Sequence, residues 1–114
     1  MDGERRDCER IAILGNLTGE MMVYHPMTIR EIGIGGASVE TVFPLHLDSL
    51  HDLRLTLGDR SIVLKGRVVH SRVTDMDQEA VIYQSGLEFV EASDRVKVAL
   101  AEYISELKTQ RSGL

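Results

Sequence analysis

Hydrophobic and polar residues change their pattern twice along the 114-residue chain. Residues 1–10, MDGERRDCER, show no apolar periodicity and predict a flexible, arginine-bearing arm. From Ile11 onwards, short apolar runs are separated by Gly, Asn, Asp and Pro, a pattern typical of β-strands and turns. We therefore expect six strands, over residues 11–23, 27–33, 36–42, 52–57, 61–73 and 79–91.

After Val90 the period of the apolar residues becomes helical. One stripe of a helix is formed by Val96, Leu100, Tyr103, Ile104 and Leu107. Ser93 or Asp94 can cap the first turn, and Asp94 also suits the positive end of the helix dipole. The pattern predicts a C-terminal α-helix over residues 93–109.

Together these elements predict a single, mainly β domain over residues 1–114. Closing the six strands into an antiparallel β-barrel, over residues 11–92, removes the sheet edges that a small β domain must otherwise protect. The apolar stripe of the helix needs a surface to cover it, which either the barrel or a partner chain can supply. The expected fold is a six-stranded antiparallel β-barrel with a C-terminal α-helix.

Composition and charge exclude several classes of protein. A net charge of −5 and the lack of tryptophan argue against a nucleic-acid binder, which needs a basic face and aromatic stacking platforms. No apolar run approaches the roughly 18–20 residues of a membrane-spanning helix, so no membrane insertion is expected. The charged N-terminus does not resemble a signal peptide, and Cys8, the one cysteine, allows no intrachain disulfide. We expect a cytoplasmic protein.

Three arginines, Arg5, Arg6 and Arg10, stand in the N-terminal arm. One interpretation is a solvated, charge-balanced tail, because acidic residues are interleaved with them. The other rests on the planar guanidinium group, which can hold phosphate oxygens or the O6 and N7 atoms of guanine bidentately and can stack on a purine. Such groups on an arm could fold over a ligand that carries both phosphates and guanines.

A second segment, Arg30-Glu-Ile-Gly-Ile-Gly-Gly-Ala-Ser38, has three glycines in four positions, which predicts a tight turn or a close approach of two backbones. It is not a dinucleotide-binding fingerprint, because Ser38 replaces the third glycine and the next residues read as a strand. The simplest interpretation is a connection between two strands. Glu31 is then either a solvent-facing strand residue or a carboxylate that accepts two N–H groups from a guanine edge.

In combination, these segments resemble the PilZ domain family, whose signature is an Arg-x-x-x-Arg arm followed by an Asp/Asn-x-Ser-x-x-Gly turn between two strands. The chain has Arg6-Asp-Cys-Glu-Arg10 and then Glu31-Ile-Gly-Ile-Gly-Gly36. Val63-Leu-Lys-Gly-Arg-Val-Val69 is similar to the family's strand before its long hairpin. Tyr83-Gln-Ser-Gly-Leu-Glu-Phe-Val90 is similar to its last core strand. The resemblance extends from Arg5 to about Leu107.

The resemblance implies a six-stranded barrel that senses cyclic di-GMP in bacteria without catalysis. Carried over by position, Arg6 and Arg10 are the principal cationic contacts to the ligand, with Arg5 as a third. Glu31, Gly33 and Gly36 form the turn side of the pocket. The implied partners are cyclic di-GMP and a protein that reads the occupied state, and a homodimer is compatible with the sequence. No cofactor and no metal are expected.

Two residues depart from the family pattern. Glu31 stands where the family has Asp or Asn, which keeps an acceptor but lengthens the side chain. Gly33 stands where the family has Ser, so one hydroxyl is missing. The loss of a neutral hydrogen bond, worth ~0.5–1.5 kcal/mol, weakens binding by about tenfold at most. An alternative function is therefore a divergent PilZ domain that binds no nucleotide and acts as a protein-interaction module.

Other candidate sites lack a recognisable spacing. His46 and His51 are too few to indicate a metal site without further ligands. Cys8 belongs to no nucleophilic or redox motif, and no Ser/His/Asp order or pair of carboxylates indicates catalysis. The sequence therefore predicts a binding domain and not an enzyme.

Overall fold

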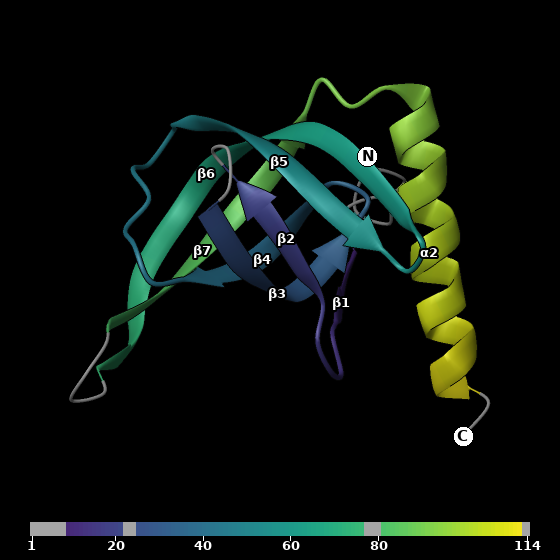
Figure 1. The fold of residues 1–114 in the computed structure, drawn as a ribbon, viewed down its shortest axis with the longest axis horizontal. Coiled ribbons are helices and arrows are strands. Elements are labelled where there is room, and N and C mark those ends of the chain that lie inside the picture. Colours follow the sequence, from purple (N-terminus) through teal and green to yellow (C-terminus); the bar gives the residue numbers. More distant parts are fainter. Residues whose placement is uncertain (1–8, 22–24, 77–80, 113–114) are drawn as a thin grey trace.

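The computed structural model describes residues 9–21, 25–76 and 81–112 and shows one sheet and one long helix (Figure 1). The strands are β1 (Arg10–Ala12), β2 (Thr18–Met21), β3 (His25–Gly33), β4 (Gly36–Thr41), β5 (Leu50–Leu57), β6 (Arg60–Met76) and β7 (Val81–Val90). The helix is α2 (Asp94–Ser112).

All neighbouring strands in the sheet are antiparallel, in the order β1-β3-β2-β5-β6-β7-β4. A further pairing of β3 with β4 closes the sheet, so β2 to β7 form a six-stranded barrel and β1 is an outer strand on β3. The predicted six-stranded antiparallel barrel with a C-terminal helix is thus confirmed.

The prediction of one continuous strand over residues 11–23 was wrong, because this stretch forms two short strands, β1 and β2. Gly15 adopts φ 119°, in the left-handed region that takes the chain out of the extended conformation. Both pieces still pair with the same edge of β3. β1 pairs with the last residues of β3, and β2 pairs with the first residues of β3. The break at Gly15 therefore leaves β1 as a separate three-residue strand.

The core lies inside the barrel and follows the alternation of each strand. In β5, for example, Leu53, Leu55 and Leu57 face inwards and their neighbours face solvent. One buried serine also lies on the inner face, where Ser85 Oγ donates to the Ser71 hydroxyl oxygen at 2.9 Å. Among the described side chains, no buried polar atom lacks a hydrogen-bond partner.

Two bulges interrupt the pairing of β6 with β7, between Val68 and His70 and between Val73 and Asp75. Because an extra residue bends a strand, such bulges re-aim the side chains that follow them. Beyond the bulges, the ends of β6 and β7 project from the barrel on the side away from α2 (Figure 1).

Helix α2 lies against one side of the barrel (Figure 1). Ser93 caps it by accepting a hydrogen bond from the Val96 amide at 3.2 Å. The predicted apolar stripe is confirmed, since Leu100 and Ile104 are buried in the barrel's core cluster and the other stripe residues are partly buried against it. No helix in the described ranges is long and apolar enough to cross a membrane.

Two exposed ion pairs also join α2 to the barrel. Arg60, the first residue of β6, contacts Glu102 at 2.6 Å. Lys108, near the end of the helix, contacts Glu9 at 2.7 Å, next to the start of β1. Exposed pairs of this kind contribute only about 0–1 kcal/mol each, so burial of the apolar stripe is the main force that holds the helix in place.

Candidate functional site

The end of the predicted arginine arm lies against the glycine turn. Arg10 is the first residue of β1 and stands opposite Gly33 in β3. Its guanidinium also reaches the start of β4, where Nη2 lies 3.1 Å from the place that a Cβ on Gly36 would take. Residues far apart in the sequence are thus brought together on the outer surface of the barrel.

The glycines at this place are required by close backbone approaches. A Cβ on Gly33 would come within 3.0 Å of the backbone carbonyl oxygen of Glu9, which crosses directly above it. A Cβ on Gly36 would collide in the same way with the carbonyl oxygen of Leu87 in β7. Any side chain at either position would force one backbone to move. This is the close approach that the cluster of glycines predicted.

Glu31 lies on the same outer face and is exposed. It stands between Ala12 of β1 and Ser38 of β4, just after an irregularity in the pairing of β3 with β4. No described residue forms a hydrogen bond or an ion pair with its carboxylate. The same holds for the Arg10 guanidinium. The face therefore offers one cation and one acceptor that are not engaged within the described part of the chain.

Arg5 and Arg6, the other two predicted contact residues, lie outside the described residues. Of the six predicted site residues, the structure therefore places four: Arg10, Glu31, Gly33 and Gly36. All four belong to β1, β3 and β4, which are adjacent in the sheet.

The sequence analysis missed residues of β6 and β7 that continue this face. Glu88 stands opposite Gly36 and forms an ion pair with Arg67 of β6. That pairing offsets the repulsion that Glu88 would exert on an anion near Gly36. The next outward position of β7 is Gly86, on which the ring of His70 lies so closely that a Cβ would collide with it.

A third polar contact lies further along the face. Gln84 donates from Nε2 to the Ser38 hydroxyl at 3.1 Å and accepts from Arg72 Nη2 at 2.9 Å. This network fixes the outer surface of β4, β7 and β6 beside Arg10 and Gly36. The alternation in Tyr83-Gln-Ser-Gly-Leu-Glu-Phe-Val90 could have identified which residues of β7 face outwards. The residues of β4 and β6 that lie beside them depend on the register between the strands, which the sequence does not show.

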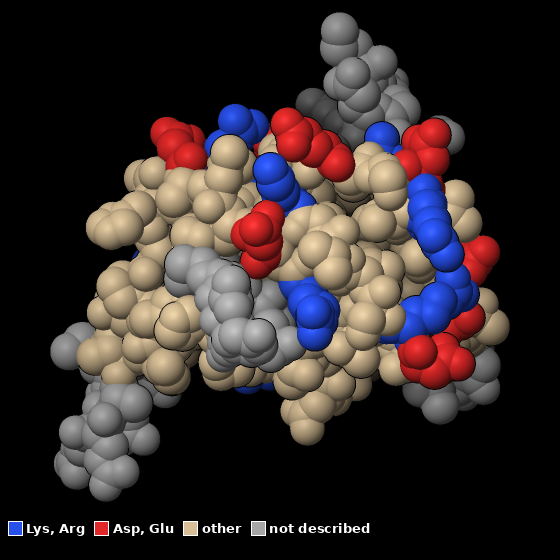
Figure 2. Space-filling view, turned by 45° about the horizontal axis from the view of Figure 1, so that its top comes forward, with Lys and Arg blue, Asp and Glu red and all other residues tan. Residues whose placement is uncertain are grey.

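On the face shown in Figure 2, the charges of the described residues are mixed and form no broad basic area. Lysine and arginine side chains stand there beside aspartate and glutamate side chains. This distribution agrees with the expectation that an anion would be held by a few local cations and not by a general positive field.

The histidines show no metal-binding arrangement. Within residues 9–21, 25–76 and 81–112, no three His, Cys, Asp or Glu residues lie close enough together to hold a metal ion. His51 has its Nε2 2.8 Å from Ser49 Oγ. Partial burial, and then the charge of His46, lower the pKa of His51 from its usual value of 6.5.

Known structures with the same fold include PilZ proteins bound to c-di-GMP. The PilZ domain of YcgR from Escherichia coli with c-di-GMP has a TM-score of 0.74 and 14% identity, over 90% of this chain and 91% of that one. The MrkH–c-di-GMP complex from K. pneumonia has a TM-score of 0.79 and 18% identity, over 91% of this chain and 52% of that one. PlzA from Borreliella burgdorferi, in complex with c-di-GMP, has a TM-score of 0.64 and 14% identity, over 95% and 55%.

At such low sequence identities, the TM-scores show a common fold and nothing more. The chain spans only about half the length of MrkH and PlzA. No curated protein matches the chain in sequence. The family model for the PilZ domain, however, matches residues 4–106. The match covers both segments singled out in the sequence and every strand and most of the helix of the described fold. The chain therefore belongs to the PilZ domain family.

Proposed function

We propose that this chain is a receptor domain for cyclic di-GMP and carries out no catalysis. The observation that carries the proposal is the position of the Arg10 guanidinium against Gly36, which unites the arginine arm and the glycine turn on one face. Family membership and the folds of the c-di-GMP complexes of YcgR, MrkH and PlzA support the choice of ligand.

Each residue of the face has a chemical role toward such a ligand. Arg10, with Arg6 and Arg5 from the segment before β1, supplies forked donors for phosphate oxygens and for O6 and N7 of guanine. The Glu31 carboxylate, which no described residue engages, can accept the two N–H groups of a guanine edge. Gly36 has no side chain, so the Arg10 guanidinium can lie against the backbone at the start of β4.

The proposal also includes a switch. Binding orders the segment that contains Arg5 and Arg6 over the nucleotide, and a partner protein reads the new surface. Ordering a segment on binding is a common way to convert occupancy into a signal. In a limited proteolysis experiment, cyclic di-GMP should protect the peptide bonds between residues 1 and 8, and equal cleavage with and without the ligand contradicts this part of the proposal.

Isothermal titration of the chain with cyclic di-GMP, with GTP as the control ligand, tests binding. The double variant Arg6→Ala/Arg10→Ala should abolish the heat of binding. Its thermal midpoint should stay almost unchanged, because Arg10 is exposed and its guanidinium forms no hydrogen bond or ion pair with any described residue. Lys97→Ala, which removes an exposed cation from α2, is the matched control and should bind as the parent does. Equal affinity of the double variant and the parent would refute the site.

The alternative function is a protein-interaction module that binds no nucleotide, and it rests on the serine hydroxyl of the family pattern that this chain lacks at Gly33. The backbone of Glu9 crosses Gly33 so closely that the position leaves no space for the serine of the family pattern. Absence of heat with both nucleotides, for a chain with the expected thermal unfolding transition, would select this alternative.

A further inference from the structure

Glu88 of β7 lies between two arginines on the outer surface of the barrel. On one side it stands directly opposite Arg67 of β6, and the two side chains form an ion pair. On the other side it stands opposite Gly36 of β4, the residue against which the Arg10 guanidinium lies. The Glu88 carboxylate is therefore placed between one cation that it engages and a second cation that no described residue engages.

The second arginine is within reach of the Glu88 side chain. A Cβ on Gly36 would touch both Nη2 of Arg10, at 3.1 Å, and the carbonyl oxygen of Leu87. The guanidinium and the peptide bond between Leu87 and Glu88 thus lie beside the same missing methyl group. Directly opposed residues of antiparallel strands have Cβ atoms only about 4.5–5.5 Å apart, so a change of rotamer can turn the Glu88 carboxylate from Arg67 towards Arg10.

Two other carboxylates lie near Arg10, and neither forms an ion pair with it. Glu9, the preceding residue, is paired with Lys108 at 2.7 Å. Glu31 stands opposite Ala12, two residues further along β1, so its Cβ lies diagonally about 7–8 Å from that of Arg10. No described residue engages the Glu31 carboxylate. The acidic residues around Arg10 are thus either held by other cations or set off to the side.

We propose that Arg67 is a positioning residue of the nucleotide site, which holds the Glu88 carboxylate beside β6 and so keeps the Arg10 guanidinium free for an anionic ligand. Without Arg67, Glu88 turns to Arg10, occupies the donors that would bind a phosphate or a guanine, and repels the phosphates by its charge. Arg67 itself does not contact the ligand. The choice of cyclic di-GMP rests on the proposed function, whereas the competition of two arginines for Glu88 does not.

Isothermal titration with cyclic di-GMP, in a double-mutant cycle, measures the role of Arg67. Arg67→Ala should weaken binding about fivefold to tenfold, because the ligand must then displace an exposed ion pair and approach an uncompensated carboxylate. In the Glu88→Gln background there is no carboxylate to release, so the same substitution should change the affinity less than twofold. Lys65→Ala is the matched control, since it breaks the ion pair of the same strand with Glu91, and should bind as the parent does.

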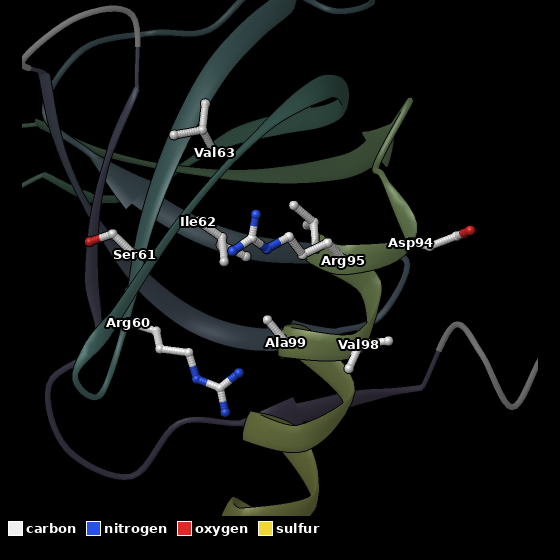
Figure 3. A pocket seen from close by; sticks show the side chains of 9 residues that line it. Arg60, Ser61, Ile62, Val63, Asp94, Arg95, Val98 and Ala99 are labelled. Carbon is white, nitrogen blue, oxygen red and sulfur yellow. The ribbon is translucent and has the colours of Figure 1, made fainter.

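A second measurement needs no nucleotide. Phenylglyoxal reacts with the neutral form of arginine, and a neighbouring carboxylate stabilises the charged form, so an ion pair slows the reaction. Mass spectrometry of peptides gives the rate for Arg10 relative to Arg95 of α2, an internal reference whose exposed side chain extends into the groove between β6 and α2 (Figure 3). Arg67→Ala should slow the modification of Arg10 at least threefold, and Arg67→Ala/Glu88→Gln should restore the rate of the parent.

The variants are expected to fold as the parent does. The side chains of Arg67 and Glu88 are 44% and 47% exposed, and an exposed ion pair contributes little to stability. Lys65 is exposed to a similar extent. Thermal midpoints of all variants should therefore agree with that of the parent, and their measurement separates a change at the site from a loss of the fold.

Two results would overturn the proposal. Arg67→Ala could weaken nucleotide binding equally with and without Glu88→Gln, which would show that Arg67 binds the ligand directly, or it could leave the affinity unchanged. The rate of Arg10 modification could also be unchanged in Arg67→Ala, which would show that Glu88 does not turn to Arg10. If the parent gives no heat with cyclic di-GMP, the proposed function fails, and the rate of modification then decides alone whether Arg67 keeps Glu88 from Arg10.

Discussion

Replacing Gly33 by serine tests whether the close approach of two backbones determines the residue at this position. The serine Cβ would come within 3.0 Å of the Glu9 carbonyl oxygen, and an ordinary contact needs about 3.5 Å. Either β3 or β1 must then retreat. β3 is held by Ile29 and Ile32, which are fully buried, whereas β1 is held by Ile11, by three residue pairs with β3 and by an exposed ion pair at its start. We expect β1 to move.

The loss of stability in Gly33→Ser follows from the movement of β1. Forcing extra atoms into a packed place costs about 1–3 kcal/mol, and loss of the Ile11 burial sets a similar limit of about 1.5–3 kcal/mol. For a domain of 114 residues this corresponds to a fall of roughly 4–12 °C in thermal midpoint. Because β1 begins with Arg10, the guanidinium also leaves Gly36, and the proposed nucleotide should bind more weakly.

Thermal and urea unfolding, together with titration of cyclic di-GMP, measure both effects. Ala12→Ser is the matched control, since it adds a hydroxyl to an exposed position of β1 without a collision, and should shift the midpoint little. If Gly33→Ser unfolds within about 0.5 kcal/mol of the parent, or binds the nucleotide more tightly, the argument from backbone crowding is refuted.

Two further predictions concern stability. Ser93→Ala removes the cap of α2 and should lower the free energy of unfolding by about 1 kcal/mol in urea titrations, whereas an unchanged midpoint would show that the cap contributes nothing. The pKa of His51 is lower in the folded chain than in the unfolded one, so the unfolded chain takes up the proton more readily and the contribution of His51 to stability decreases as the pH falls through about 6.5. His51→Gln should reduce the loss of stability between pH 7.5 and 5.5, and an identical loss in parent and variant would contradict this.

Local patterns were sufficient to predict most of the fold. The alternation in the strands and the stripe along the helix depend on residues that are close in sequence, and both are found in the structure. The division of residues 11–23 was missed because the apolar pattern continues through Gly15, and only its left-handed conformation shows the break. A glycine permits such a conformation but does not require it.

The candidate site depended on pairing between distant strands, which the sequence does not reveal. The resemblance to the PilZ family pointed to Arg10, Glu31, Gly33 and Gly36, but not to the positions opposite them. Glu88 reaches Gly36 through the register of β4 and β7, and Arg67 reaches Glu88 through the register of β6 and β7. A shift of one residue in either register would turn these side chains to the other face of the sheet.

The crowding at Gly33 also changes the meaning of its departure from the family pattern. From the sequence, the glycine is a lost hydroxyl, worth ~0.5–1.5 kcal/mol to the proposed ligand. In the structure, the absent side chain lets the Glu9 backbone lie on β3, which places Arg10 against Gly36. A hydrogen bond from the Arg10 guanidinium to the proposed nucleotide would contribute about 1.5–3 kcal/mol, which exceeds the contribution of the missing serine hydroxyl. For the proposed nucleotide, glycine at this position therefore supports binding through Arg10 more than it weakens binding through the missing serine.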